Sequence, residues 1–260
     1  MKLLFVVALA PTLFAHDMWI EPAVFVAQPG QMLGIKLRVG QELIGDPIAR
    51  STQLINRFIV TGPDGERPVV GRDGSDPAGY IRATGPGLMI VGYNSNASSV
   101  DLPAEKFNLY LKDEGLDSIL ALRARRNQDK APSHEQFFRC AKSLVQAGPA
   151  SSTQTDRVLG FPLELVAERN PYVLPPGADF AVRLTYENKP LAGAAVTAIN
   201  RLNPGEKQTQ RSGKDGRASF KLRGGGMWMI KSVHMVPAPA GSAHEWNSYW
   251  ASLTFETGKN

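Results

Sequence analysis

The chain has 260 residues, one cysteine and a formal net charge of +5 at pH 7. A single cysteine excludes an intramolecular disulfide and a cysteine-rich metal cluster. The basic residues are scattered and do not alternate with aromatic residues, which argues against a nucleic-acid-binding surface. Beyond the first residues, no stretch reaches the roughly 18 apolar residues that a membrane-spanning helix needs, so we expect no membrane insertion.

Residues 1–15 have the pattern of a secretory signal peptide. A lysine at the second position precedes an uninterrupted apolar run over 3–9, which is too short to cross a bilayer. A cut before Pro11 should be blocked by the proline, so we expect cleavage after Ala15, with a cut a few residues away as the alternative. The expected mature protein is periplasmic or secreted and begins with His16.

The sequence is dominated by strand patterns. A Pro-Gly turn followed by apolar alternation predicts a strand within 28–40, and the stretch 175–190 has the same pattern. A second pair of similar stretches is found at 85–94 and 224–235. Repeats this long and this faint indicate two related β modules.

Between the strand patterns we predict a helical insertion at about 103–147. A proline at a helix-start position precedes apolar residues at helical spacing over 103–127, where Gly115 should divide the helix in two. The stretch 133–148 begins with serine and has glutamine at the third helical position, which is a capping-box pattern. Cys140 lies on the apolar stripe of this second helix, and we expect it to be buried and unreactive.

The second half of the chain has short strand patterns at intervals of about 10 residues, which is typical of a β-sandwich. Its turn and strand at 189–200 and the Asp-Gly turn within 212–222 resemble those of immunoglobulin-like or transthyretin-like modules. We therefore predict a mainly β fold of two such β-sandwich modules, 16–155 and 160–257. The helical insertion belongs to the first module, and the two modules should share an apolar interface.

The familiar catalytic motifs of hydrolases and nucleotide-binding enzymes are not found in the sequence, so we do not expect an ordinary enzyme. Four histidines are the remaining candidates for chemistry: His16, His134, His234 and His244. We expect His134 to be solvated or to cap a helix. Strand alternation places His234 at the rim of the core, where a purely structural role is the alternative. His244 follows a loop rich in proline, glycine and alanine.

Several short stretches resemble the DUF4198 family: "AHDMWIEP", "ERNPY" at 168–172, "PLAGAAV", and the ending "WMIKSVHM…HEWNSYWASLTFE". These are exported bacterial proteins associated with nickel uptake, and similar domains occur as periplasmic components of nickel and cobalt transporters. The resemblance covers essentially the whole mature chain. It implies periplasmic metal handling, with a membrane metal transporter as a partner. The family pattern often has an acidic residue where His244 and Glu245 stand, which leaves the role of His244 open.

The histidines suggest how a metal ion could be held. Imidazole and amine nitrogens suit Ni, Co, Cu and Zn. The free amine of His16, its imidazole and the imidazole of His234 would give three nitrogens, as in a histidine brace. Asp17 could orient an imidazole or add an oxygen, and His244 is a further candidate ligand. The resemblance implies nickel or cobalt, whereas the Irving–Williams order favours copper, so we rank nickel or cobalt first and copper close behind.

Two other functions fit the same sequence. A histidine-brace copper oxidase acting on a polysaccharide would need exposed aromatic residues as a sugar platform, for which Trp246, Tyr249 and Trp250 are the candidates. We expect these three to be core residues instead. A metal-free β-sandwich module for adhesion or carbohydrate binding, with structural histidines, is the other alternative.

Overall fold

The computed structural model describes residues 16–258, so the predicted signal peptide at 1–15 lies outside the described residues. Within this range the chain consists mainly of strands, with two α-helices and one turn of 3-10 helix. The prediction of a mainly β fold is therefore confirmed.

The strands, in chain order, are β1 Asp17–Pro22, β2 Val26–Ala27, β3 Met32–Gln41, β4 Ile44–Ile48, β5 Ile55–Gly62, β6 Gly65–Pro68, β7 Gly79–Arg82, β8 Gly87–Ser95, β9 Ser98–Leu102, β10 Ser133–Ala147, β11 Leu163–Ala167, β12 Asp179–Tyr186, β13 Lys189–Pro190, β14 Ala195–Asn200, β15 Asn203–Arg211, β16 Arg217–Lys221, β17 Gly226–Pro237 and β18 Trp246–Thr257. The helices are α1 Ala104–Asp113, α2 Asp117–Arg125 and the 3-10 helix η2 Pro171–Val173.

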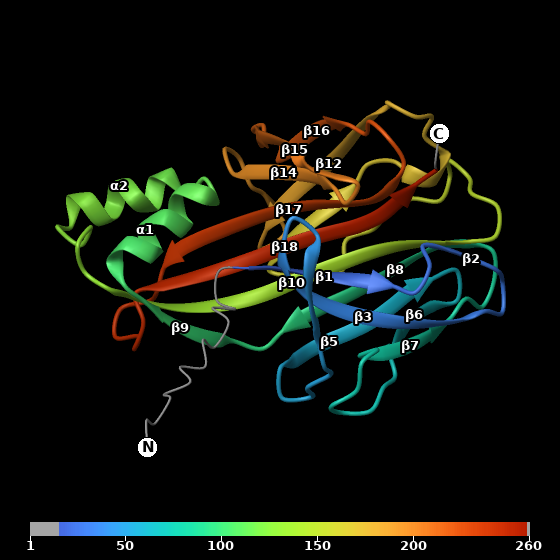
Figure 1. Ribbon diagram of the computed structural model, residues 1–260, viewed down its shortest axis with the longest axis horizontal. Coiled ribbons are helices and arrows are strands. Elements are labelled where there is room, and N and C mark those ends of the chain that lie inside the picture. Colours follow the sequence, from blue (N-terminus) through green and yellow to red (C-terminus); the bar gives the residue numbers. More distant parts are fainter. Residues whose placement is uncertain (1–15, 259–260) are drawn as a thin grey trace, which may run out of the picture.

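A central sheet runs through the whole molecule in the order β15-β14-β17-β18-β10-β8-β5-β6, and β2 and β9 also pair with β10. Its longest strands, β10, β17 and β18, lie side by side along the long axis (Figure 1). β18 is antiparallel to β17 and parallel to β10. Strands from both predicted modules, 16–155 and 160–257, thus share one sheet, and the two-module layout is not confirmed.

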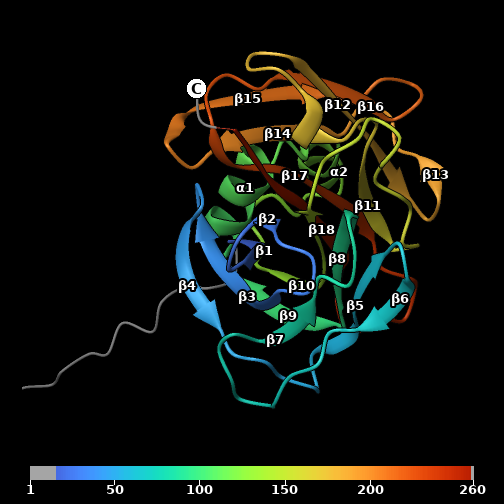
Figure 2. The same cartoon turned by 90° about the vertical axis from the view of Figure 1, so that its right-hand side faces the viewer.

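Two smaller sheets cover opposite faces of the central sheet (Figure 2). One consists of β1-β3-β4 with β7 beside β3, and the other of β11-β12-β13 with β16 beside β12. Successive side chains of a strand point to opposite faces, which explains how one strand serves both layers. Along β18, Leu253 and Phe255 join the core beneath β12, whereas the hydroxyls of Ser252 and Thr254 bond to β1 on the other face. The fold is therefore a three-layered β-sandwich.

The structure of β10 differs from the prediction for this stretch. The helix predicted over 133–148 is wrong, because Ser133–Ala147 form a strand. Cys140 faces the core beneath β12, and its neighbour Ala141 faces the core beneath β3. Cys140 is buried as expected, and burial raises the pKa of its thiol to about 12, so it is a poor nucleophile.

The helical insertion predicted at about 103–147 is therefore reduced to α1 and α2. Gly115 separates them as expected and has a φ of +66°, a conformation that favours glycine. The apolar face of α1 packs Phe107 against the same core cluster as Trp246 and Trp250, at the end of the central sheet. No helix in residues 16–258 is long and apolar enough to cross a membrane.

A buried ion cluster fixes the segment that connects the two halves. Lys142 on β10 has its Nζ 2.9 Å from Asp156 Oδ1 and 3.0 Å from Glu164 Oε1, and all three side chains are at most 1% exposed. The Glu164 carboxylate also accepts the backbone N–H groups of 159–161, at 2.7, 2.9 and 3.2 Å. The connecting segment is therefore tied to the centre of the fold.

The "ERNPY" stretch at 168–172 also has a structural role. The side-chain oxygen of Asn170 accepts the backbone N–H of Tyr172 at 3.0 Å and so caps η2. The Tyr172 hydroxyl donates to the carbonyl of Leu144 on β10 at 2.6 Å. This motif thus joins η2 to the central sheet.

Candidate functional site

The first strand positions two of the predicted metal ligands, His16 and Asp17. β1 pairs with β3 and also packs on β10 and β18 of the central sheet. The Ser252 hydroxyl donates to the carbonyl of Met18 at 2.8 Å. Nη1 of Arg139 donates to the carbonyl of His16, also at 2.8 Å. The backbone of His16 is therefore held in place from the central sheet.

Asp17 is engaged in an ion pair. Its Oδ1 lies 2.8 Å from Nζ of Lys231 on β17, and the same ammonium lies 2.8 Å from Oε1 of Glu114. Burial disfavours the ammonium charge, but the two carboxylates more than offset this and raise the pKa of Lys231. Burial raises the pKa of Glu114. Asp17 thus anchors β1 to the central sheet and is not directed toward the same side as His16.

The side chain of His16 points to the opposite side of the chain from that of Asp17 and lines the same cavity as a different carboxylate, that of Asp46. The register places Met18 opposite Val39 and Val39 opposite Asp46, so these residues share one face of the small sheet. His16 and Asp46 line one cavity of about 420 Å³ beside this face. Its lining residues are His16, Val39, Gly40, Gln41, Ile44, Gly45 and Asp46.

His234 lies on the opposite face of the central sheet. Its ring centre is 4.5 Å from that of Tyr186 on β12, at the rim of the core as predicted, and burial lowers its pKa. Lys231 precedes it by three residues and points to the other face, where it reaches Asp17. The central sheet therefore separates His16 from His234, and the expected convergence of their imidazoles is not formed.

The other two histidines are also apart from His16 in the fold. His244 belongs to the loop that precedes β18, and its Nε2 lies 2.8 Å from Oδ1 of Asn247 on β18. His134 is exposed and its Nδ1 pairs with Asp101 on β9. Within the described part of the chain, no group of three or more His, Cys, Asp or Glu side chains is arranged to hold a metal ion.

A larger, mostly apolar cavity of about 470 Å³ adjoins the His16 cavity and shares Val39 and Asp46 with it. It lies between the β3–β4 hairpin on one side and β8 and β10 on the other. Its lining residues are Met18, Val39, Asp46, Pro47, Ile48, Ala49, Leu54, Tyr93, Ser95, Ser98, Phe137 and Arg139. A concave apolar site with a few polar groups is the usual form of a small-molecule site.

Arg139 is the buried cation of this apolar cavity, and sequence reasoning missed it. The residue is 8% exposed, and its guanidinium lies 4.9 Å from the ring centre of Phe137 and 4.6 Å from that of Trp250. Among residues 16–258, no carboxylate lies within 4 Å of it. Burial lowers its pKa, which the more distant carboxylates of Asp17, Glu135 and Glu114 partly offset. The available signal was an arginine inside the apolar stretch "FFRCA".

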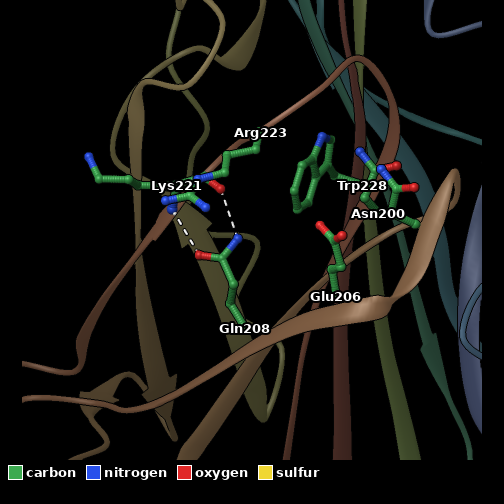
Figure 3. Close-up of a pocket in the computed structure, with 7 residues that line it drawn as sticks. Asn200, Glu206, Gln208, Lys221, Arg223 and Trp228 are labelled. Atoms are coloured by element: carbon green, nitrogen blue, oxygen red, sulfur yellow. Dashed lines mark hydrogen bonds between the residues drawn. The ribbon is translucent and has the colours of Figure 1, made fainter.

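A third cavity, of about 280 Å³, lies beside β15 and β16 (Figure 3). Gln208 bonds to both backbone groups of Lys221, accepting at 3.1 Å and donating at 2.8 Å. The Lys221 ammonium is turned away and pairs with Asp179 at 3.0 Å. The indole N–H of Trp228 is buried without a hydrogen-bond partner in the described range, and the Glu206 carboxylate lies near the ring. Because its polar groups mainly join strands, this cavity is the weaker candidate.

Comparison with known proteins gives a family and no function. No curated protein matches the chain. Among solved structures it is similar to the "D0-D1 domain of Intimin", at 11% identity and a TM-score of 0.22, over 91% of this chain and 96% of that one, which is too low to carry an argument. A family model described as "Domain of unknown function (DUF4198)" matches residues 13–236, so the chain belongs to the DUF4198 family.

Proposed function

We propose that this protein is exported, binds a divalent transition metal ion at His16 and supports metal uptake. Nickel or cobalt is the first choice, with copper close behind. The observation that supports this proposal is that His16, fixed through its carbonyl by Arg139, lines one cavity together with the Asp46 carboxylate. A cleaved N-terminus would add a free amine at the same residue.

The donor set fits such an ion once the ligands are revised. The amine and imidazole of His16 belong to one residue and can close a chelate ring, and Asp46 replaces His234 as the third ligand. Nitrogen donors suit Ni, Co and Cu, and a carboxylate oxygen is compatible with all three. Both nitrogens bind a metal ion only in their neutral form, so metal binding at this site competes with protons.

The surrounding structure favours metal binding over polysaccharide oxidation. Trp246 and Trp250 are 0% and 5% exposed, which confirms that they are core residues and removes them as a sugar platform. The ring centre of Tyr249 lies 5.1 Å from that of Phe138 and 5.2 Å from that of Tyr186. These aromatic residues thus contribute to packing within and between the sheets.

The test compares the protein that begins at His16 with one that keeps Ala15 in front of it. We expect the extended protein to bind Ni(II), Co(II) and Cu(II) at least tenfold more weakly in calorimetric titrations, because its terminal amine is displaced. Asp46→Asn should also weaken binding, whereas His234→Ala should leave it unchanged and serves as the matched control. Equal affinities of the native and extended proteins would contradict the proposal.

A further inference from the structure

We propose that the apolar cavity beside His16 binds a small organic monocarboxylate, with the carboxylate on Arg139 and the apolar body between the β3–β4 hairpin and the central sheet. This inference does not depend on a metal ion at His16. It rests on the chemistry of the cavity wall, which combines one buried cation with a largely apolar surface.

Arg139 has hydrogen-bonding capacity to spare. A guanidinium carries five N–H donors, and the bond that this one makes in the described range is from Nη1 to the His16 carbonyl. Burying a cation without a direct ion pair is costly, and a planar carboxylate is the partner that matches the guanidinium fork. Asp17 and Glu114, which act on Arg139 at longer range, pair directly with Lys231, so a ligand carboxylate in the cavity would supply the direct ion pair that residues 16–258 do not.

The arginine is also pre-organised. Its guanidinium lies close to the rings of Phe137 and Trp250, at 4.9 and 4.6 Å from their centres. Its backbone N–H donates to the hydroxyl of Ser95 at 2.8 Å. A side chain held in this way loses little conformational freedom when a ligand binds, which increases affinity.

The other residues that line the cavity determine which apolar body the ligand can have. Met18, Ile48, Leu54 and Tyr93 offer apolar surface to an alkyl chain or a single aromatic ring. A cavity of about 470 Å³ lies within the range of small-molecule sites. Asp46, on the same wall, would repel a second carboxylate, which favours a monocarboxylate over a dicarboxylate.

The test uses metal-free protein beginning at His16, with octanoate and 3-phenylpropanoate as probes. Their neutral counterparts are octanol and 3-phenylpropanol, and suberate is the dicarboxylate. We expect both acids to bind in calorimetric titrations and to change tryptophan fluorescence, since Trp250 lies against Arg139. The alcohols and suberate should bind at least tenfold more weakly.

Two variants locate the site. Arg139→Met should abolish the preference for the acids over the alcohols. Because this buried replacement can impair folding, Ala49→Trp provides a second test: Ala49 is exposed at the cavity edge, and the larger ring should block entry. Ala240→Trp, at an exposed position in the loop before β18, is the matched control and should bind as the unchanged protein does. Equal binding of acids and alcohols, no binding of either acid, or unchanged binding by Ala49→Trp would overturn the proposal.

Discussion

Replacing Lys142 by methionine should lower the free energy of unfolding by about 3–5 kcal/mol, because it leaves two buried carboxylates without their cation. Asp156 and Glu164 lie 2.9 and 3.0 Å from the Lys142 ammonium, and neither is exposed. Burial raises the pKa of Asp156, so the carboxylate depends on this cation to stay ionised. Urea denaturation followed by circular dichroism measures the effect.

Lys221→Met is the matched control for this experiment. Lys221 forms an ion pair of similar length with Asp179, at 3.0 Å, but their side chains are 54% and 68% exposed. An exposed pair of this kind contributes less than about 1 kcal/mol, so the control should be nearly as stable as the unchanged protein. If both variants lost the same stability, the buried cluster would have no special role in anchoring the connecting segment.

Glu135→Gln should remove most of the pH dependence of stability between pH 5 and pH 8. Burial raises the pKa of Glu135 from an ordinary 4.5 to about 7, although Ser248, Tyr110 and, at longer range, Arg139 favour the ionised form. Between these two pKa values the folded protein holds a proton that the unfolded chain releases, so stability falls as the pH rises. The loss is complete above about pH 7 and amounts to roughly 3 kcal/mol.

The glutamine keeps an oxygen that can accept the hydroxyls of Tyr110 and Ser248, as Glu135 does. It also resembles the protonated acid, so the variant should match the unchanged protein near pH 5 and exceed its stability at pH 8. Glu206→Gln, at an exposed carboxylate on β15, is the control and should retain the full pH dependence. Parallel stability profiles of Glu135→Gln and the unchanged protein would show that another group titrates.

The fold class was predictable because many short strand patterns in the sequence are bounded by turn residues such as Pro-Gly and Asp-Gly. β10 was not predictable from its pattern, since a strand buried on both faces has no polar face and loses the alternation with a period of two. In addition, Ser133 and Gln136 have the spacing of a capping box, which favoured the prediction of a helix. In the fold both belong to an antiparallel pairing with β9 instead.

The candidate site was predictable in part. The position of His234 at the rim of the core followed correctly from alternation along β17. Which face of the central sheet β1 would cover depends on the order of strands far apart in sequence, which local patterns do not contain. The environment of Arg139 was not predictable for the same reason. Its partners Phe137 and Trp250 are brought together by the pairing of β10 with β18.

The placement of β18 determines when this protein can fold during its synthesis. Trp246–Thr257 follow β10 by about a hundred residues in the chain, yet they form the strand between β10 and β17 at the middle of the sheet. A growing chain therefore exposes one edge of β10, and the face that carries Cys140 and Leu144, until the later strands have emerged. Long-range pairing of this kind is slow and leaves incomplete chains prone to aggregation. Loss of β18 should thus leave a chain that chaperones retain and proteases degrade, rather than a folded protein with a shortened edge.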